Sequence, residues 1–249
     1  MNPKVMVLYG EGLNCDKETE HALRVSGADT EKVNIRQMIE NPGMLKDYQI
    51  LAFVGGFLHG DALGAGRYMG ATIRKKMPEE IQRFIESDKL VIGICNGFQV
   101  LAHAGILPGF DGDYTKNGGV TLTYNDIGRF RDQWFNLNAE GKKCIWTEGI
   151  DSLYLPIRHA EGKFVPGEGV LEKLYEQDLV VFKYAPGENP NGSVDDIAGI
   201  CDPTGRVLGI MPHPEAYNHR TNHPRWTREE LPEEGEGLKI FRNAVRYFD

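Results

Sequence analysis

Short apolar runs alternate with segments of helical periodicity in the N-terminal part of the chain, and this alternation restricts the fold most. The patterns of buried strands cover Lys4–Tyr9, Ile50–Val54 and Leu90–Ile94, and Asp29–Val33 is expected to be a further strand. Helical spacing follows several of them: Asp16 is expected to cap the first helix, and one apolar series runs from Ile73 to Ile85. Strands and helices in this order predict an α/β protein with an open, mostly parallel sheet and helices on both faces.

A different rhythm begins after Pro108, where short strand patterns follow one another with only turns between them. These patterns cover Val120–Tyr124, Trp134–Asn138, Leu153–Ile157, Leu179–Tyr184, Ile197–Cys201 and Val207–Met211. They predict a mixed or antiparallel extension of the sheet, and Leu238–Phe248 predicts a closing helix. Neither a linker composition nor an internal repeat is visible, so residues 1–249 are expected to form a single domain.

Composition excludes several classes of protein. Hydrophobic residues make up 41% of the 249 residues, which is typical of a globular chain rather than a disordered one. Asp and Glu outnumber Lys and Arg by 36 to 28, which argues against binding to nucleic acid or to an anionic membrane. The four cysteines form no C-x-x-C pair, and no signal peptide or long apolar run is visible. We therefore expect no metal site and a cytoplasmic location.

The most informative motif is GICNGFQ at residues 93–99, directly after an apolar strand. It has the G-x-nucleophile-x-G form of a strand-to-helix elbow, with Cys95 in the nucleophile position. Gly93 and Gly97 are small enough to let such a sharp turn close. A helix N-terminus favours the thiolate of Cys95, and the backbone N–H of Asn96 is expected to face a developing oxyanion. A lone motif of this kind is also found around ordinary buried cysteines. The strand before it and the helical pattern after it are what favour a nucleophile at this position.

A second apolar run leads into the sequence HPE at residues 213–215. His213 is suited to act as a base toward Cys95 and then as an acid toward a leaving amine. Glu215 would orient the imidazole and stabilise its protonated form. The prolines on either side of His213 stiffen the segment. Taken alone, the segment is more typical of a surface turn with a solvated histidine, but together with the elbow it predicts a Cys–His–Glu triad.

These two motifs resemble the class I, or triad, glutamine amidotransferases. Further blocks resemble, within that class, the glutaminase subunit of phosphoribosylformylglycinamidine synthase, and the resemblance runs over nearly the whole chain. These blocks are VGGFLHGD at 54–61, LPG at 107–109, HAEG at 159–162 and NGSVDDIAG at 191–199. The resemblance implies a flavodoxin-like amidotransferase fold. It also implies that Cys95 attacks the side-chain amide of glutamine, forms a thioester and releases ammonia.

The resemblance also implies a partner and a set of residues that bind the substrate. The ammonia would pass to a large synthetase subunit that uses ATP and Mg²⁺ to make formylglycinamidine ribonucleotide in purine biosynthesis. This chain itself would hold no cofactor, and a small third subunit is left open. Gly55 and Gly56 would supply a second oxyanion N–H, Gln99 would lie near the substrate, and Gly192 and Ser193 would hold the α-groups of glutamine.

Each of these positions also has an ordinary structural interpretation. The glycine pair and the Asn-Gly sequence at 191–192 are both typical of tight turns. Gln99 fits a solvated helix face equally well. His159 and Glu161 fit either supporting groups around the site or a partner surface, and they are not assigned to the triad.

The segment 218–237 is polar and rich in glutamate, and it is expected to be a surface insertion. The residues that would serve a partner or cover the site are Arg225, Trp226 and Arg228. His219 and His223 stand four residues apart, but Pro224 and the lack of helical periodicity argue against a metal pair.

Other functions remain open from the sequence. The chain fits an amidotransferase subunit of another synthetase, or a related cysteine hydrolase such as a γ-glutamyl hydrolase or a peptidase. A subunit that only docks on a synthetase is a third interpretation, against which the intact triad argues.

Overall fold

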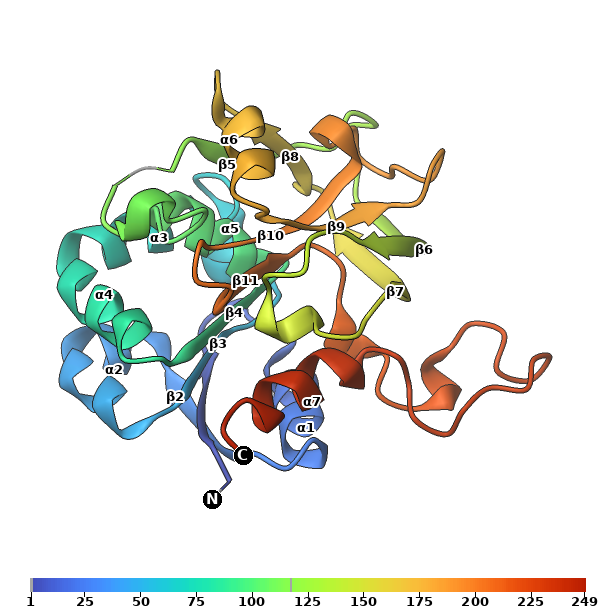
Figure 1. Ribbon diagram of the computed structural model, residues 1–249, viewed down its shortest axis with the longest axis horizontal. Helices are drawn as coiled ribbons and strands as arrows, with labels where there is room; N and C mark the ends of the chain where they lie inside the picture. Colours follow the sequence, from blue (N-terminus) through green and yellow to red (C-terminus); the bar gives the residue numbers. More distant parts are fainter. Residues whose placement is uncertain (1, 117) are drawn as a thin grey trace.

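The computed structural model describes residues 2–116 and 118–249, and its centre is a nine-stranded mixed sheet (Figure 1). The strands lie in the order β2-β1-β3-β4-β11-β10-β9-β6-β7. The first five of them in this order, which are parallel, are β2 (Asp29–Asn34), β1 (Lys4–Tyr9), β3 (Ile50–Phe53), β4 (Leu90–Ile94) and β11 (Val207–Ile210). All residues of β3, β4 and β11 are buried, so both faces of this half are covered.

The direction of each crossover places the helices on two faces. The helices are α1 (Asp16–Val25), α2 (Ile35–Glu40), α3 (Arg67–Lys76), α4 (Pro78–Glu86), α5 (Asn96–Ala104), α6 (Val170–Glu176) and α7 (Leu238–Arg246). The connection through α1 runs outward from β1 to β2, whereas the connection through α3 and α4 runs the other way, from β3 to β4. Because such crossovers are right-handed, α1 lies on the opposite face from α3 and α4. The α5 helix packs on α3, and α7 packs beside α1 (Figure 1).

The other half of the large sheet is antiparallel. It consists of β10 (Ile197–Cys201), β9 (Val180–Tyr184), β6 (Arg131–Ala139) and β7 (Ser152–His159). The predicted mixed extension is therefore present. The strand expected at Val120–Tyr124 does not join it. Instead β5 (Val120–Thr123) pairs with β8 (Lys163–Pro166) in a separate two-stranded sheet near α6.

Two local expectations need correction. The apolar series from Ile73 to Ile85 is not one helix, because the chain breaks at Met77, where φ is −145°, and Pro78 starts α4. Proline has no N–H to continue the preceding helix, and it disfavours helical backbone in the residue before it. Asp16 is the first residue of α1 rather than its cap, and Cys15 in the capping position makes no side-chain cap bond.

Several short 3₁₀ turns connect these elements. They are η1 (Pro42–Asp47), η2 (Leu58–Asp61), η3 (Phe110–Gly112), η4 (Ile145–Thr147), η5 (Val194–Asp196), η6 (Pro214–Ala216) and η7 (Arg220–Asn222).

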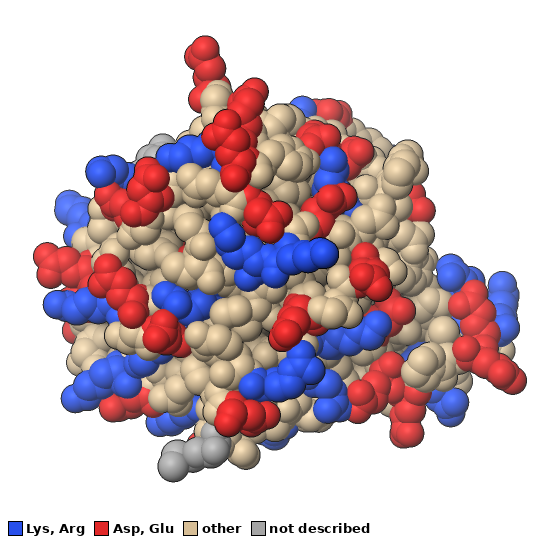
Figure 2. Space-filling view, in the orientation of Figure 1, with Lys and Arg blue, Asp and Glu red and all other residues tan. Residues whose placement is uncertain are grey.

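On the face shown in Figure 2, acidic and basic side chains are interspersed. No helix in the described part of the chain is both long enough and apolar enough to cross a membrane.

Candidate active site

The adjacent parallel strands β4 and β11 bring the two predicted motifs to the same edge of the sheet. Their register pairs Ile94 with Ile210, so the residues that follow each strand emerge side by side. The backbone N–H of Cys95 donates to the carbonyl of Ile210 at 2.8 Å and fixes this relation. Ligands bind at the carboxyl ends of strands in open α/β sheets, and this edge is such a position.

Cys95 lies in a strained turn between β4 and α5. Its φ of 51° and ψ of −107° are unfavourable for a residue with a side chain. A Cβ atom on Gly97 would lie 2.0 Å from the carbonyl oxygen of Phe53, and one on Gly93 would lie 2.5 Å from a methyl group of Leu101. Both positions therefore require glycine. The thiol of Cys95 is almost fully buried and donates to the carbonyl of Arg158 at 3.8 Å.

His213 and Glu215 form a buried pair just beyond β11. The backbone N–H of His213 donates to the carbonyl of Pro156 at 2.8 Å, which ties the segment to β7. Imidazole Nδ1 donates to Glu215 Oε1 at 2.5 Å. Within the described residues, His213 Nε2 has no hydrogen-bond partner, and neither has Glu215 Oε2.

Opposing effects act on the pKa of His213. Burial lowers this pKa, but the negative charge of Glu215, followed by the interactions with Cys95 and Cys15, raises it well above its usual value. The imidazole therefore holds a proton readily while it faces the thiol of Cys95. A cysteine, a histidine and an orienting carboxylate in contact can activate a thiol nucleophile and transfer its proton.

The glycine pair after β3 lies against this histidine. A Cβ atom on Gly55 would be 2.8 Å from His213 Cε1, and Gly56 has a φ of 143°. The carbonyl of Gly55 accepts hydrogen bonds from the backbone of residues 14 and 15, and the N–H of Phe57 donates to Gly12 at 2.8 Å. The loop is thus close enough to the triad to contribute backbone groups, and it is held in place by the segment 12–15.

Asn96 and Gln99 are buried in a polar cluster on the first turn of α5, so Gln99 is not on a solvated face. The side-chain amide of Asn96 donates to Gln99 Oε1 at 3.1 Å and to Asp61 Oδ1 at 3.3 Å. The amide of Gln99 donates in turn to the carbonyl of Glu161, whose carboxylate accepts from the N–H of Ala65. Burial and the nearby charge of Glu161 raise the pKa of Asp61 to about 6.

Gly192 and Ser193 form part of a neighbouring turn. Gly192 has a φ of 81°, and a Cβ atom there would collide with the carboxylate of Asp126. The hydroxyl of Ser193 donates to Asn191 Oδ1 at 2.7 Å and accepts from the N–H of Phe164 at 3.0 Å. No hydrogen bond among the described residues joins either position to the triad.

His159 is also buried close to the site. Burial, together with the nearby charge of His213, lowers its pKa to about 3. Its Nδ1 lies 3.1 Å from Asn125 Oδ1, so the neutral imidazole donates from that nitrogen. A Cβ atom on Gly162 would lie 2.1 Å from the ring, so the HAEG sequence folds closely around this histidine.

No pattern in the sequence marks Cys15, which the structure places beside the triad. Its Sγ lies 3.9 Å from His213 Nδ1, and burial raises the pKa of its thiol. A cavity of about 180 Å³ opens here. It is lined by Asn14, Cys15, Glu18, Gly56, Phe57, Phe130, Arg158 and His213.

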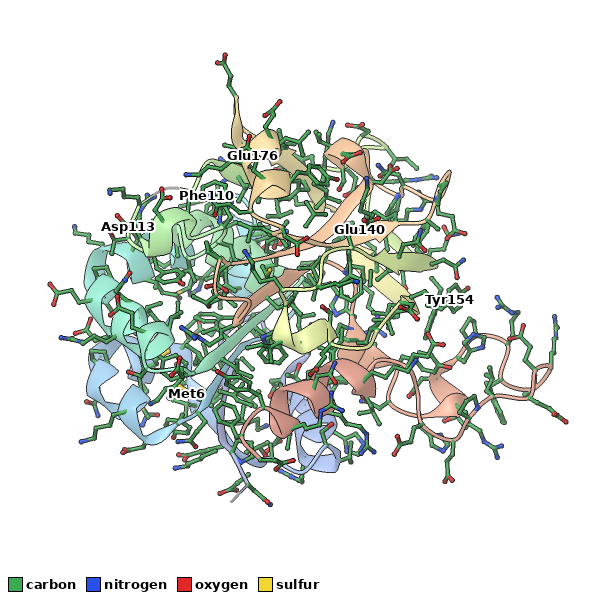
Figure 3. The ribbon with its side chains drawn as sticks, in the orientation of Figure 1. Met6, Phe110, Asp113, Glu140, Tyr154 and Glu176 are labelled. Carbon is green, nitrogen blue, oxygen red and sulfur yellow. The ribbon has the colours of Figure 1, made fainter. Side chains whose placement is uncertain are left out.

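The polar segment 218–237 projects from the side of the molecule and is mostly exposed at its tip (Figure 1). Its base is fixed by His223, whose ring packs against Trp134, Tyr154 and Tyr217. Figure 3 labels Tyr154, which lies on the side from which the segment projects. His219 Nδ1 is in contact with Thr221, whereas the ring of His223 is buried and its Nδ1 accepts from the N–H of residue 225. The two histidines therefore serve the segment's own structure.

Of the predicted partner-facing residues there, Arg225 lies over the ring of Tyr154 and pairs with Glu229. Trp226 is 46% exposed. Arg228 is also exposed.

The fold and the elbow together define a class of α/β proteins that carry a nucleophile at the end of a central parallel strand. A family model described as the CobB/CobQ-like glutamine amidotransferase domain matches residues 2–248. The chain therefore belongs to this family of glutamine amidotransferases.

Two curated relatives are similar over nearly their whole length. The chain is 46% identical to the phosphoribosylformylglycinamidine synthase subunit PurQ of Dehalococcoides mccartyi, over 98% of this chain and 97% of that one. It is 38% identical to the PurQ subunit of Treponema denticola, with 99% of each chain covered. A chain in the structure of PurLQS from Thermotoga maritima superimposes with a TM-score of 0.77 and 29% identity, and both chains are fully covered.

Proposed function

We propose that this chain is the glutaminase subunit of a phosphoribosylformylglycinamidine synthase, in which it hydrolyses glutamine to glutamate and ammonia. Full-length similarity to PurQ subunits supports this assignment. The observation that carries the chemistry is that Cys95, on a strained elbow, faces the buried pair formed by His213 and Glu215.

The first half of the reaction forms a thioester. His213 takes the proton of the Cys95 thiol, and the sulfur attacks the side-chain amide carbon of glutamine. The amide oxygen becomes negative and accepts hydrogen bonds from the backbone N–H of Asn96 and from the loop at Gly55 and Gly56. As the first residue of α5, Asn96 has an N–H that is not needed by the helix. His213 then protonates the amine, the carbon–nitrogen bond breaks and ammonia leaves.

The second half reverses these roles. Water gives a proton to His213 and attacks the thioester carbonyl at the same oxyanion site. The carbon–sulfur bond breaks, the thiolate of Cys95 regains its proton from His213, and glutamate leaves. Glu215 keeps the imidazole oriented and stabilises its positive charge in both halves.

The remaining predicted residues serve to hold glutamine. Gln99 orders the floor of the site through Asn96, and the turn at Gly192 and Ser193 is the proposed contact for the α-groups. The buried Tyr184 supports this placement: burial and the charge of Cys95 raise the pKa of its hydroxyl, and Asn191 lowers it. Tyr184 thus lies near both the turn and the nucleophile.

The ammonia is consumed by a partner. A large synthetase subunit, using ATP and Mg²⁺ that it binds itself, converts formylglycinamide ribonucleotide to formylglycinamidine ribonucleotide in purine biosynthesis. This chain acts as one amidotransferase domain, in the cytoplasm, and a small third subunit is compatible with the assignment.

The decisive experiment replaces Cys95 by alanine and compares two nitrogen sources in the reconstituted synthase. We expect Cys95→Ala to abolish synthesis from glutamine, while synthesis from added ammonium continues at the rate of the complex with the unmodified chain. His213→Ala and Glu215→Ala should also impair glutamine use, Glu215→Ala less severely.

Cys144→Ala is the matched control, because this thiol is buried and lies outside the site. Persistent use of glutamine by Cys95→Ala would contradict the mechanism. Hydrolysis of peptides or γ-glutamyl peptides in preference to free glutamine would contradict the assignment and favour a related hydrolase.

A further inference from the structure

Three side chains beside the nucleophile combine a sulfur, a nitrogen and an oxygen ligand in one small volume. They are Cys15, His213 and Glu215, and one ligand atom of each lies within 4.8 Å of the others. The Cys15 Sγ to His213 Nδ1 distance is 3.9 Å, and the His213 Nδ1 to Glu215 Oε1 distance is 2.5 Å. All three residues are buried.

This set of donors matches the preferences of Zn²⁺. Zinc binds thiolate sulfur at ~2.3 Å and imidazole nitrogen or carboxylate oxygen at ~2.0–2.2 Å, in a tetrahedron. In that geometry the ligand atoms lie ~3.3–3.7 Å apart. The sulfur-to-nitrogen distance is close to this range, and the nitrogen-to-oxygen distance must open by less than ~1 Å.

Two independent features suit this position to an ion. Glu215 Oε2 is buried and has no hydrogen-bond partner within the described residues, so this carboxylate oxygen is free to act as a metal ligand. The cavity of about 180 Å³ is lined by Cys15 and His213, so solvent reaches the cluster and can supply a fourth ligand. A thiolate and a carboxylate together neutralise a divalent cation, which favours its burial.

We propose that Cys15, His213 and Glu215 form a zinc-binding site, and that the bound ion switches off the nucleophile Cys95. Zinc binds the Cys15 thiolate and His213 Nδ1, so the proton of the Cys15 thiol is released to solvent. The single proton of the neutral imidazole moves from Nδ1 to Nε2, the nitrogen left to face Cys95. The imidazole then has no lone pair with which to accept the Cys95 proton, so thioester formation stops.

The inhibitory consequence rests on the proposed glutaminase function, whereas metal binding itself does not. Binding is therefore measured separately, with Co²⁺ as a spectroscopic substitute for Zn²⁺ on the full chain. We expect one equivalent of Co²⁺ to give a sulfur-to-cobalt charge-transfer band and the visible bands of a four-coordinate ion. Zn²⁺ added afterwards should displace the bound Co²⁺ and remove these bands.

Cys15→Ser should abolish the charge-transfer band and weaken Zn²⁺ binding at least 10-fold. Cys95→Ser should keep both, as should Cys144→Ser, the control for a buried thiol elsewhere in the chain. Loss of the band in Cys95→Ser but not in Cys15→Ser would overturn the proposal, because the metal would then bridge Cys95 and His213.

X-ray absorption at the zinc edge tests the site without any substitution. The unmodified chain with one equivalent of Zn²⁺ should show one sulfur ligand and otherwise nitrogen or oxygen ligands. No sulfur, or two sulfurs, would rule the site out even if Cys15→Ser failed to fold.

The consequence for catalysis is then measured as inhibition of glutamine hydrolysis, with each variant compared with its own rate without metal. We expect Cys15→Ser to need at least 10-fold more Zn²⁺ for half inhibition. Equal sensitivity of the two proteins would refute the switch. An absence of glutaminase activity without metal, even with the synthetase subunit, its nucleotide substrate and ATP present, would instead refute the proposed function and leave the binding result unaffected.

Discussion

His159 and His213 are both buried imidazoles in the same region, yet their pKa values move in opposite directions. Burial lowers both values, but His213 also faces the charges of Glu215 and Cys95, which outweigh burial. For His159, burial and the nearby positive charges of His213 and Arg131 lower the pKa to about 3, and its Nδ1 lies against the neutral amide of Asn125. Burial alone therefore makes a histidine a neutral packing group, and a charged partner makes it a proton carrier.

The depressed pKa of His159 predicts a loss of stability in acid. The unfolded chain binds a proton near pH 6.5, and the folded chain does so only near pH 3, so stability falls as the pH drops between these values. From pH 7 to pH 5 this amounts to about 2 kcal/mol. Urea unfolding of the unmodified chain and of His159→Gln, at both pH values, isolates this contribution.

His159→Gln should be less stable at pH 7, because it loses packing, but its stability should decline less on acidification. His213 is present in both proteins, so the difference between their declines reports His159 together with its interaction with His213. An identical decline in the two proteins would show that His159 does not cause the loss of stability in acid.

Asp61 has the opposite effect on the pH dependence. Its pKa is raised to about 6 by burial and by Glu161, above the value of an unfolded aspartate, so the folded chain binds the extra proton. Stability therefore falls as the pH rises from about 4 to 6. Asp61→Asn keeps an acceptor for Asn96 and removes the charge.

We expect Asp61→Asn to stabilise the chain by about 1 kcal/mol at pH 7.5, after allowance for the solvent that screens this half-buried group, and by almost nothing at pH 4. Thermal unfolding at the two pH values measures the difference. A larger gain at pH 4 than at pH 7.5 would contradict the assignment.

The element that makes the site is the β4–α5 elbow. Its strained residue is held by the backbone hydrogen bond from Cys95 to β11 on one side and by the start of α5 on the other. Gly97 lets α5 approach the carbonyl of Phe53 at the end of β3. The position of the nucleophile and the packing of α5 against β3 thus depend on the same close contact.

Gly97→Ala should therefore damage both stability and activity. The new methyl group would lie 2.0 Å from the carbonyl oxygen of Phe53, and backbone cannot move away as a flexible side chain does. We expect a loss of more than about 2 kcal/mol in unfolding free energy, together with loss of glutamine hydrolysis.

Gly43→Ala is the matched control. A Cβ atom there meets nothing closer than 3.8 Å, and its stability should change by less than about 0.5 kcal/mol. Similar losses in the two variants would mean that glycine at the elbow is needed only for general backbone reasons.

At the scale of the whole molecule, the order of the strands assembles the site. Although β11 comes last in the chain, it lies between β4 and β10, and this brings His213 beside Cys95. The sequence predicted the elbow because its strain and its glycines lie within five residues. It also indicated every strand of the large sheet, most of them as separate apolar runs, although β2 and β6 carry several polar residues.

Long-range contacts could not be predicted in the same way. Cys15 meets His213 across 198 positions, and no local pattern marks that contact. The strand β8 has only four residues and ends in a proline, so it lacks a clear alternation of apolar and polar residues. Helical periodicity extended across Pro78, because the apolar spacing continues where the backbone breaks.

The loop beside the nucleophile suggests how the whole complex affects the rate. The N–H of Phe57 donates to the carbonyl of Gly12, so one backbone donor of this loop is already occupied in the chain by itself. A partner that releases or reorients the loop would raise the fraction of molecules with a complete oxyanion site.

We therefore expect glutamine hydrolysis to rise at least tenfold when the synthetase subunit, its nucleotide substrate and ATP are added. That rise corresponds to a shift of about 1.4 kcal/mol in the loop equilibrium. Steady-state rates with and without these components measure it, with Cys95→Ala as the background. An equal rate in the two mixtures would mean that the loop is already competent in the chain alone, with Phe57 bonded to Gly12 as the structure has it.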